Sequence, residues 1–395
     1  MQPHPGLTGG PIYLDYNATT PVDPAVVDAA LPYLRAHFGN PSSTHAYAQR
    51  PRQALATTRQ QLAELLGCAP DEVIFTGSGS EADTLAIHGV ALARRNHGDH
   101  IITQATEHPA VLQACRALAE RHGFRVTVLP VDPHGQVDPA ALEAAITPQT
   151  VLVTIQHANS ETGTIQPIHA LAEIAHARGV LVHTDAAQSV GKLPVDVNEF
   201  GVDLLTVVGH KLYAPKGVGA LYIRQGVAVA PVLFGGGQER GLRAGTENVA
   251  LIVALGAAAS IAAERLDGEP QRLRGLRDRL QQQLTERLGG GVGRNGHPGQ
   301  RLPNTLNVSV DGVIGQQVLA ATPQVAASTG SACHAADPEP SSVLLAMGVT
   351  RQRALGALRL TLGRWSTRAE VDTAASLLAA AALALRGQAS AAAPR

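Results

Sequence analysis

The chain has 395 residues, of which 45% are hydrophobic and 16% are charged, so it can bury a large core and form two or three domains or lobes. Its net charge of -1 and its pI near 7.0 exclude a protein that gathers nucleic acid or an anionic membrane by bulk positive charge. The N-terminal residues lack the basic and apolar regions of a signal peptide, and three cysteines cannot form a disulfide framework. We therefore expect a cytoplasmic globular protein with reduced thiols.

The first two-thirds of the chain alternates short β-branched runs with amphipathic segments. After an extended run at 12–14, helices are expected at about 24–38 and 49–66. Strands are expected at 73–75, 101–103, 126–129, 151–155, 180–182 and 204–208, with helices beginning near residues 81, 109, 139 and 168. This alternation is typical of parallel βαβ units in a sheet buried on both faces, which defines an α/β fold.

The composition changes after residue 248. An Ala- and Leu-rich helical tract, 249–288, shows no polar constellation and should bridge to a second lobe. The remaining elements are expected at 306–310 (strand), 354–362 (helix or strand) and 368–386 (helix), with disorder at 387–395. We expect a large domain at 18–260 and a smaller α+β domain formed by 1–17 and 261–395.

Polar residues follow several of the predicted strands, where the strand ends of an open parallel sheet form a crevice. They are Glu107, His108, His157, Asn159, Ser160, Glu161, Asp185, Gln188, His210 and Lys211. No histidine or cysteine spacing matches a metal site.

Lysine is scarce, since only Lys192, Lys211 and Lys216 occur among 31 basic Lys and Arg residues. Arginine cannot supply a neutral nucleophilic nitrogen, whereas a lysine amine can form a Schiff base with an aldehyde cofactor. Lys211, at the end of a predicted strand, is the candidate. The alternative is an ordinary surface lysine, which we favour for Lys192 and Lys216.

Two further segments have ambiguous signals. The glycine-rich turn 76–80 joins a strand to a helix, so Gly79 and Ser80 can offer backbone N–H groups to a phosphate, although a plain tight connection has the same pattern. Asn40 lies in a Gly-Asn-Pro-Ser run that either faces a ligand or forms a turn.

Cys333 lies in a segment rich in Gly, Ser, Ala and Pro, as expected for a loop thiol that can become a nucleophile.

Seven motifs share their order and spacing with one enzyme family. They are YLDYNATTPVDP, FTGSGSEADTLAI, TEHPAVL, HTDAAQSVGK, GHKLYAPKGVGALYIR, GGGQERGLRAGTEN and STGSACHAADPEPS. From residue 12 to about 385 the chain resembles the pyridoxal-phosphate (PLP) cysteine desulfurases and selenocysteine lyases, which have the class V aminotransferase fold. The resemblance implies fold type I, with a mostly parallel seven-stranded sheet in the large domain.

The resemblance also implies residue roles. Lys211 holds PLP covalently and moves protons, Asp185 pairs with the pyridinium nitrogen, Gln188 donates to the ring oxygen and His108 stacks on the ring. The phosphate is expected on Gly79 and Ser80, beside His210, with Thr246 reaching in from the second subunit of a homodimer.

Substrate residues follow from the same comparison. Arg359 matches the arginine that binds the substrate carboxylate, with Asn40 and Ser160 nearby. Cys333 attacks the substrate sulfur and becomes a persulfide, so the expected reaction converts L-cysteine to L-alanine. The acceptor is a protein or thiol that the sequence does not identify, with an iron–sulfur scaffold, a tRNA-modifying enzyme or a selenium pathway as alternatives.

Two positions depart from the desulfurase pattern. Val208 replaces a serine that helps to bind the phosphate, and Ser160 replaces an asparagine that assists carboxylate binding. Val208, His334 and several motifs are closest to the selenocysteine lyase branch, so release of selenium from L-selenocysteine is the alternative function. More distant alternatives are a C–S lyase or aminotransferase that does not use Cys333, and a scaffold without catalysis.

Overall fold

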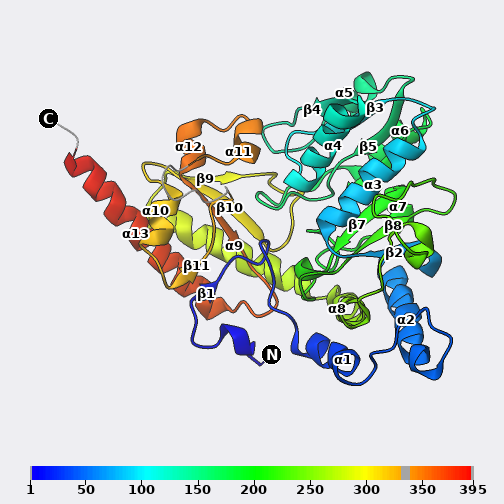
Figure 1. Ribbon diagram of the computed structural model, residues 1–395. Helices are drawn as coiled ribbons and strands as arrows, with labels where there is room; N and C mark the ends of the chain where they lie inside the picture. The colour runs from blue at the N-terminus through cyan, green and yellow to red at the C-terminus, as the bar shows by residue number, and fades with distance from the viewer. Residues whose placement is uncertain (1, 331–338, 393–395) are drawn as a thin grey trace.

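The computed structural model describes residues 2–330 and 339–392, the last four of these by their backbone alone. Cys333 and His334 lie outside the described residues. The chain forms two adjoining parts, each built around its own β-sheet (Figure 1).

The larger part contains a seven-stranded sheet in which five neighbouring strands are parallel and β8 is antiparallel to both of its neighbours. In spatial order the strands are β2 (Val73–Thr76), β8 (Gly219–Ile223), β7 (Leu204–Val208), β6 (Leu181–Asp185), β5 (Thr150–Thr154), β3 (His100–Gln104) and β4 (Arg125–Leu129). The predicted α/β fold with a mostly parallel seven-stranded sheet is confirmed.

Alternate residues of these strands enter two different cores. Leu152 and Leu204 pack in a cluster on one face, while their neighbours Val153 and Leu205 pack in a cluster on the other. Because strand side chains alternate between faces, this pattern shows that the sheet is buried on both sides, as the apolar runs predict.

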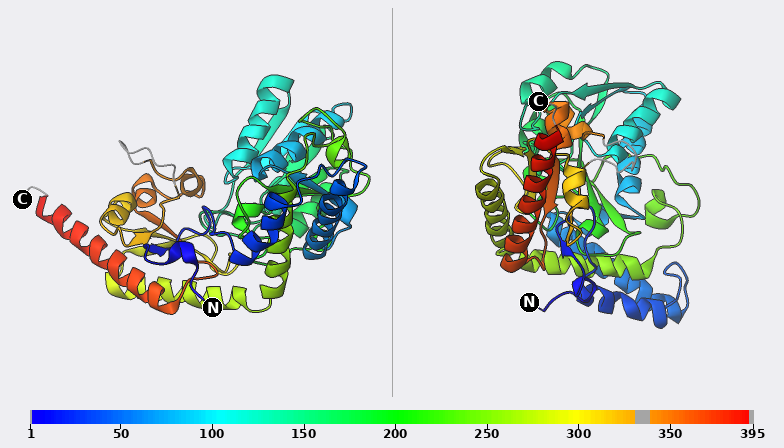
Figure 2. Two further views of the ribbon diagram at one scale, coloured as in Figure 1. Left: turned by 60° about the horizontal axis from the view of Figure 1, so that its bottom comes forward. Right: turned by 90° about the vertical axis from the view of Figure 1, so that its left-hand side faces the viewer.

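Helices cover both faces of this sheet (Figure 2). They are α1 (Pro24–Arg35), α2 (Gln49–Leu66), α3 (Gly79–Ala93), α4 (Pro109–His122), α5 (Pro139–Ala145), α6 (Ile168–His176), α7 (Val197–Phe200) and α8 (Val249–Arg265). Local signals set several of their ends. The Asp138 carboxylate accepts the Ala140 N–H at 2.9 Å at the start of α5, and Gly67 ends α2 with a φ of 71°.

The smaller part holds a three-stranded antiparallel sheet in the order β12 (Ala357–Thr361), β10 (Thr305–Val310), β9 (Val292–Asn295). A short parallel pair, β1 (Ile12–Tyr13) and β11 (Val325–Ala326), ties the N-terminal segment to it. Its helices are α9 (Glu269–Leu288), α10 (Gly315–Ala320), α11 (Ser342–Ala346), α12 (Arg351–Leu355) and α13 (Arg368–Ala392). A second core forms among α9, α13, β10 and β12. The division of the chain near residue 260 stays a prediction.

The structure corrects two element boundaries. The predicted helical tract 249–288 is two helices, α8 and α9, bent by 76° at a break of three residues that contains Gly268. The last helix continues past residue 386 to Ala392, because its alanines favour helix strongly enough to carry it across Gly387. Among the described residues no single helix has the length and apolar composition to cross a membrane, and only the bent pair α8 and α9 passes that test together.

Candidate active site

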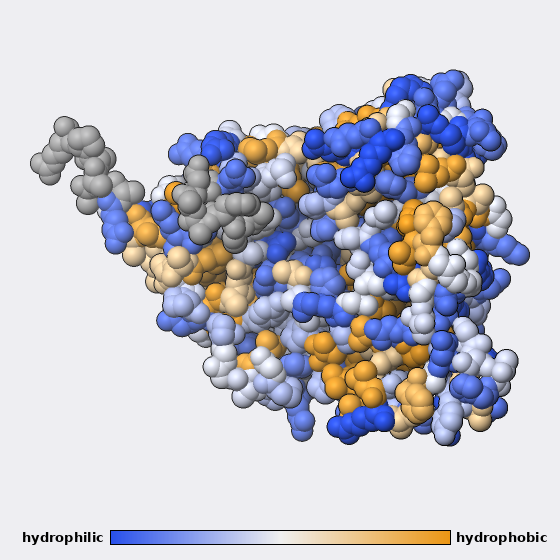
Figure 3. Space-filling model, viewed as in Figure 1, coloured by the Kyte–Doolittle hydropathy of each residue, from blue (hydrophilic) through white to orange (hydrophobic). Residues whose placement is uncertain are grey.

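A cavity of about 650 Å³ lies where the ends of β5, β6 and β7 meet the starts of α3 and α4. Hydrophilic residues gather in the hollow between the two parts of the molecule (Figure 3). Nine of the residues singled out from the sequence line this cavity: Gly79, Ser80, His108, Ser160, Asp185, Gln188, His210, Lys211 and Arg359. Segments up to 280 residues apart in the chain therefore meet at one site.

Among the described candidate residues, His157, Asn40 and Thr246 do not line the cavity. Asn40 is exposed in the loop after α1, where its side chain accepts the Ser42 N–H at 2.9 Å and so stabilises a turn. Thr246 is exposed and lines a separate pocket with Gly77 and Asn248. Cys333 is not described, but Gly330 and Glu339, at the two ends of its segment, both line the cavity.

Lys211 ends a single 3-10 turn (Gly209–Lys211) that follows β7. Its Nζ donates to the carbonyl oxygens of Asn17 at 2.6 Å and Ala18 at 2.7 Å. Burial, reinforced by the positive charge of Arg359, lowers the pKa of Lys211 to about 8. A substantial fraction of this amine is therefore neutral near pH 8, the form that attacks an aldehyde.

Asp185, the last residue of β6, presents a buried carboxylate to the same cavity. Its Oδ1 accepts the Ala187 N–H at 2.8 Å, and no ion pair with it occurs within residues 2–330 and 339–392. Burial raises the pKa of Asp185, which is the expected cost of a buried acid that lacks a cationic partner. The protonated nitrogen of a pyridine ring would supply that partner.

His108 has a defined orientation and tautomer. It caps α4, and its Nδ1 accepts the Ala110 N–H at 3.1 Å, so the ring proton is on Nε2. Burial lowers the pKa of His108, so the ring is held in this neutral form. His210, half-buried and hydrogen-bonded to Thr19, also has its pKa lowered by burial, to about 4.

Gln188 is oriented by a lysine that the sequence analysis misplaced. Lys192 is buried rather than on the surface, and its Nζ donates to Gln188 Oε1 at 2.8 Å. The Gln188 amide nitrogen is thereby fixed as the donor on the other side, where it reaches the Asn17 carbonyl at 3.1 Å. Burial lowers the pKa of Lys192 to about 7, whereas Lys216 is exposed as expected. The scarcity of lysine was the signal that could have identified Lys192.

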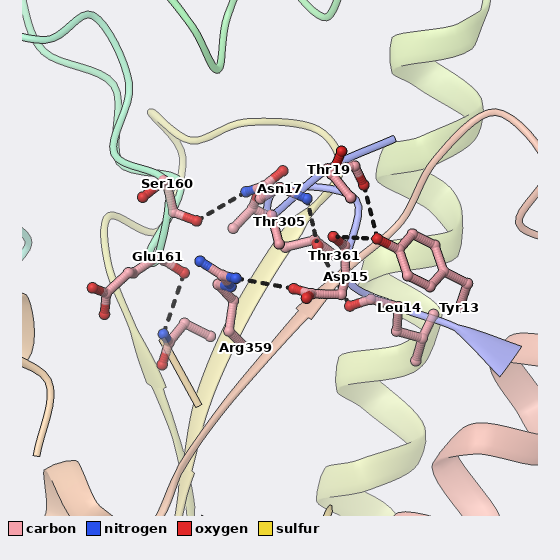
Figure 4. A network of polar contacts seen from close by, with 12 residues as sticks. Tyr13, Leu14, Asp15, Asn17, Thr19, Ser160, Glu161, Thr305, Arg359 and Thr361 are labelled. Carbon is pink, nitrogen blue, oxygen red and sulfur yellow. Dashed lines mark hydrogen bonds and ion pairs between the residues drawn. The ribbon is translucent and has the colours of Figure 1, made fainter. Parts of the chain in front are cut away.

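Asn17, which the sequence analysis quoted only within a motif, joins the two parts of the molecule (Figure 4). Its side-chain amide donates to the Ser160 carbonyl at 3.0 Å and to Thr305 Oγ1 at 2.8 Å. Its own carbonyl accepts from Lys211 and Gln188, as described above. The N-terminal segment thus positions the reactive lysine and the chain around Ser160 at the same time.

Arg359, on β12, reaches the cavity from the smaller part. One of its Nη atoms pairs with Asp15 at 2.9 Å, while its buried Nε has no partner (Figure 4). Glu161 lies nearby and accepts the Ser341 hydroxyl at 2.5 Å. The guanidinium therefore keeps unused donor capacity for a carboxylate ligand.

The first turn of α3 has the features of an anion site, which stays a prediction. The first N–H groups of a helix have no acceptor within the helix, and here they belong to Gly79 and Ser80 at the cavity wall. A Cβ atom on Gly79 would lie 2.3 Å from Val208 Cγ2. Any larger residue at position 79 would therefore collide with Val208.

We expect Gly79→Ala to destabilise the protein by about 1–3 kcal/mol, because the new methyl group overlaps Val208 and alanine otherwise suits a helix. Chemical denaturation of the single variants and of Gly79→Ala with Val208→Ala measures this. The pair should recover most of the loss, since Val208 Cβ is 3.5 Å away and leaves room. Equal loss in the single Gly79 variant and the pair would show that the contact is not the cause.

Glu107 is a second buried acid in the cavity wall. Its Oε1 accepts the Gln156 N–H at 2.6 Å, while its Oε2 has no partner. Burial, with the negative charge of Asp185 as a further contribution, raises the pKa of Glu107 from 4.5 to about 8. Between these pH values the folded protein binds more protons at Glu107 than the unfolded chain does.

This excess of bound protons makes Glu107 lower the stability of the fold as pH rises from about 4.5 to about 8. We expect Glu107→Gln, which keeps the acceptor for Gln156, to remove a slope of up to about 1.4 kcal/mol per pH unit. Denaturation of both proteins between pH 5 and pH 8 tests this. Parallel stability profiles would show that Glu107 ionises normally in the folded state.

These residues fit PLP. A reactive amine, an unpaired buried acid, an oriented amide and imidazole, and a helix N-terminus face one cavity, and each matches a different group of that molecule. Among the described residues no cluster of three or more His, Cys, Asp or Glu side chains is arranged to hold a metal ion.

Comparison with known proteins agrees with the site. The class-V aminotransferase family matches residues 12–373. The cysteine desulfurase of Mus musculus is 47% identical over 365 residues, which cover 92% of this chain and 79% of that protein. A solved NifS-like protein has a TM-score of 0.87 at 35% identity over 95% of this chain and 99% of its own. The solved structure of SspA in complex with cysteine has a TM-score of 0.78 at 37% identity, covering 90% and 99%.

The fold and the site therefore define a PLP-dependent enzyme of the class-V aminotransferase family. Within it, the chain belongs to the cysteine desulfurases. The alternative of a selenocysteine lyase is not favoured, because these relatives are named as cysteine desulfurases.

Proposed function

We propose that this protein takes sulfur from L-cysteine, releases L-alanine and leaves a persulfide on Cys333. The observation that carries the proposal is the single cavity in which Lys211, Asp185, His108 and Arg359 converge. Reactive amine, ring-pairing acid and carboxylate-binding guanidinium are thus within reach of one small amino acid.

Each residue around the cofactor has a physical task. Bound PLP supplies an electron sink for the bonds at the substrate Cα. Lys211 Nζ holds the cofactor covalently and carries the proton taken from and returned to the substrate. Asp185 keeps the ring nitrogen protonated, and Gln188, fixed by Lys192, donates its amide N–H to the ring oxygen.

The neutral His108 imidazole, whose Nδ1 accepts the Ala110 N–H, would cover the ring and keep its Nε2–H free to donate. Its orientation allows it to stack on the ring and to pass a proton. Gly79 and Ser80 bind the phosphate at the start of α3, with His210 beside them. Arg359 binds the substrate carboxylate through its free donors, and the Ser160 hydroxyl adds a shorter-reaching hydrogen bond.

The sulfur step needs a thiolate. Burial raises the pKa values of Cys68 and Cys115 to about 12, so both remain thiols at neutral pH. Cys333 is the remaining cysteine of the chain. Its Sγ attacks the substrate sulfur, the new S–S bond forms as the Cβ–S bond breaks, and the electron pair stays on Cβ, which takes a proton to give L-alanine.

We propose a homodimer in which Thr246, and the exposed loop of Asn40, act in the partner's site. Their exposure and their absence from this chain's own cavity support that arrangement. The persulfide then passes to an acceptor protein or thiol. The cytoplasmic location stays an expectation of the sequence.

Side-by-side assays of alanine release from L-cysteine and L-selenocysteine test this function. We expect L-cysteine to support turnover with transfer of its sulfur to an added thiol. Turnover of L-selenocysteine alone would instead assign the protein to selenium release, with Val208 and Ser160 as the first positions to exchange.

A further inference from the structure

The structure places a second polar groove on the outer side of the smaller part, away from the cavity. It has a volume of about 760 Å³ and lies between α9, β9 and the loop that precedes β10. Its walls are formed by Arg274, Arg277, Asp278, Gln281, Gln282, Thr285, Glu286, Arg294, Pro298, Gly299 and Arg301. α9 lies beside α13 in Figure 2, and it is the tract in which the sequence showed no polar constellation.

Two of the arginines lie at the bottom of this groove. The side chains of Arg277 and Arg301 are each only 5% exposed, and both pair with the same carboxylate, Asp278, at 2.8 and 3.2 Å. Arg277 also donates to the Leu302 carbonyl at 2.7 Å. The buried Nε atom of Arg301 has no partner. One acid therefore serves two buried guanidinium groups.

The other two arginines lack acidic partners. Within the part of the chain that the structure describes, Arg274 and Arg294 form no ion pair and no side-chain hydrogen bond, and the Nε of Arg294 is buried without a partner. Glu286, at the far end of the groove, accepts the Gln282 amide at 2.8 Å. The groove thus keeps an excess of positive charge over negative charge.

This excess has an energetic cost. Burial and the positive charges of Arg277 and Arg294 lower the pKa of Arg301 to about 10. Like charges brought together in a partly dry site repel one another, and unpaired buried donors lose their hydrogen bonds to water. A multivalent anion with several acceptor oxygens removes both costs at once.

We propose that this groove is a binding site for a phosphate-bearing small molecule. A phosphate group presents three acceptor oxygens and close to two negative charges, which suits converging guanidinium groups better than a single carboxylate does. The groove exceeds the size of a phosphate ion, so it has room for an attached organic part beside Gln281, Gln282 and Thr285, neutral side chains that each make one hydrogen bond within the protein. Arg277 and Arg301 lie at its floor, so the ligand enters the groove rather than lying across it.

Calorimetric titration of the PLP-loaded enzyme with inorganic phosphate, pyrophosphate and adenosine diphosphate tests this proposal. The loaded enzyme is used because its catalytic phosphate site is already filled. We expect saturable binding of at least one of these anions, with one site per chain. Tighter binding of the nucleotide than of the inorganic anions would identify a phosphorylated metabolite, and equal binding would identify phosphate itself.

Variants locate the site. Arg294→Gln is expected to weaken binding by at least about tenfold, because it removes one charge-assisted hydrogen-bond donor. Arg274→Gln, on the exposed side of α9, gives the same test should the Arg294 variant fail to fold. Arg287→Gln, on the same helix but outside the groove, is the matched control and should bind as the wild type does.

Three outcomes would overturn the proposal. In the first, none of the three anions binds saturably. In the second, the wild type and both groove variants bind with equal affinity. In the third, an oligoglutamate peptide binds but no phosphate compound does. The last result would make the groove a docking site for an acidic protein segment. All of these readouts are independent of alanine release, so they stand apart from the proposed reaction.

Discussion

Lys211→Ala is expected to lower alanine release from L-cysteine by at least about 10³-fold, because it removes both the covalent attachment of the cofactor and the proton carrier. Borohydride reduction of the wild type should fix the cofactor to the peptide that carries Lys211. The same treatment of the variant should leave every peptide unlabelled.

Because the chain contains only three lysines, the labelled lysine can be identified unambiguously. Lys216→Ala is the matched control, since Lys216 is exposed and lies five residues from Lys211, and it should keep full activity and labelling. Lys192 has a pKa lowered by burial and lies next to Gln188, so it is the only other described lysine with a comparable environment. Label on Lys192, or an active Lys211 variant, would contradict the assignment.

Cys333→Ala is expected to reduce alanine release from L-cysteine by at least about 100-fold, because burial keeps the other two thiols, Cys68 and Cys115, protonated and neither can replace it as the nucleophile. Attachment of the cofactor should be unchanged, since Lys211, Asp185 and Gln188 are intact. Absorbance of the bound cofactor and a coupled alanine assay measure the two effects separately.

Cys68→Ala is the matched control for this variant. Cys68 is partly buried against the core, and its thiol does not ionise at neutral pH, so its removal should leave turnover unchanged. A Cys333 variant that releases alanine at the wild-type rate would favour a C–S lyase or aminotransferase reaction that leaves this cysteine idle.

The fold could be predicted because its signals are local. The apolar runs predicted the strands at 73–75 and 204–208 within a residue, and Asp138 and Gly67 marked helix ends through their own hydrogen bonding and backbone conformation. The break between α8 and α9 was missed although the sequence marks it, because Gly268 precedes α9 and Pro270 stands in its first turn, a position typical of a helix start.

The site was predictable where a residue type is rare or is part of a motif. Lys211 and Asp185 stood at strand ends, and the structure brings both into the cavity. Lys192 was placed on the surface because no local pattern distinguishes a buried lysine from an exposed one. Its burial depends on Gln188 four residues before it and on Asn17, which comes from the other end of the chain.

The polar groove between α9, β9 and the loop before β10 was not predicted, for a similar reason. Arg277 and Arg301 are ordinary basic residues in the sequence, and they acquire a shared carboxylate only when the loop before β10 folds against α9. Partnerships of this kind depend on the relative placement of elements, whereas strand and cap signals depend on a few adjacent residues.

Mass spectrometry of the enzyme after one turnover with L-cysteine tests the central claim most directly. The account expects one molecule of L-alanine per active site and the mass of one added sulfur atom on the peptide that carries Cys333, with none in the Lys211→Ala protein. Alanine without added sulfur on that peptide, or sulfur on Cys68 or Cys115, would contradict the proposed transfer.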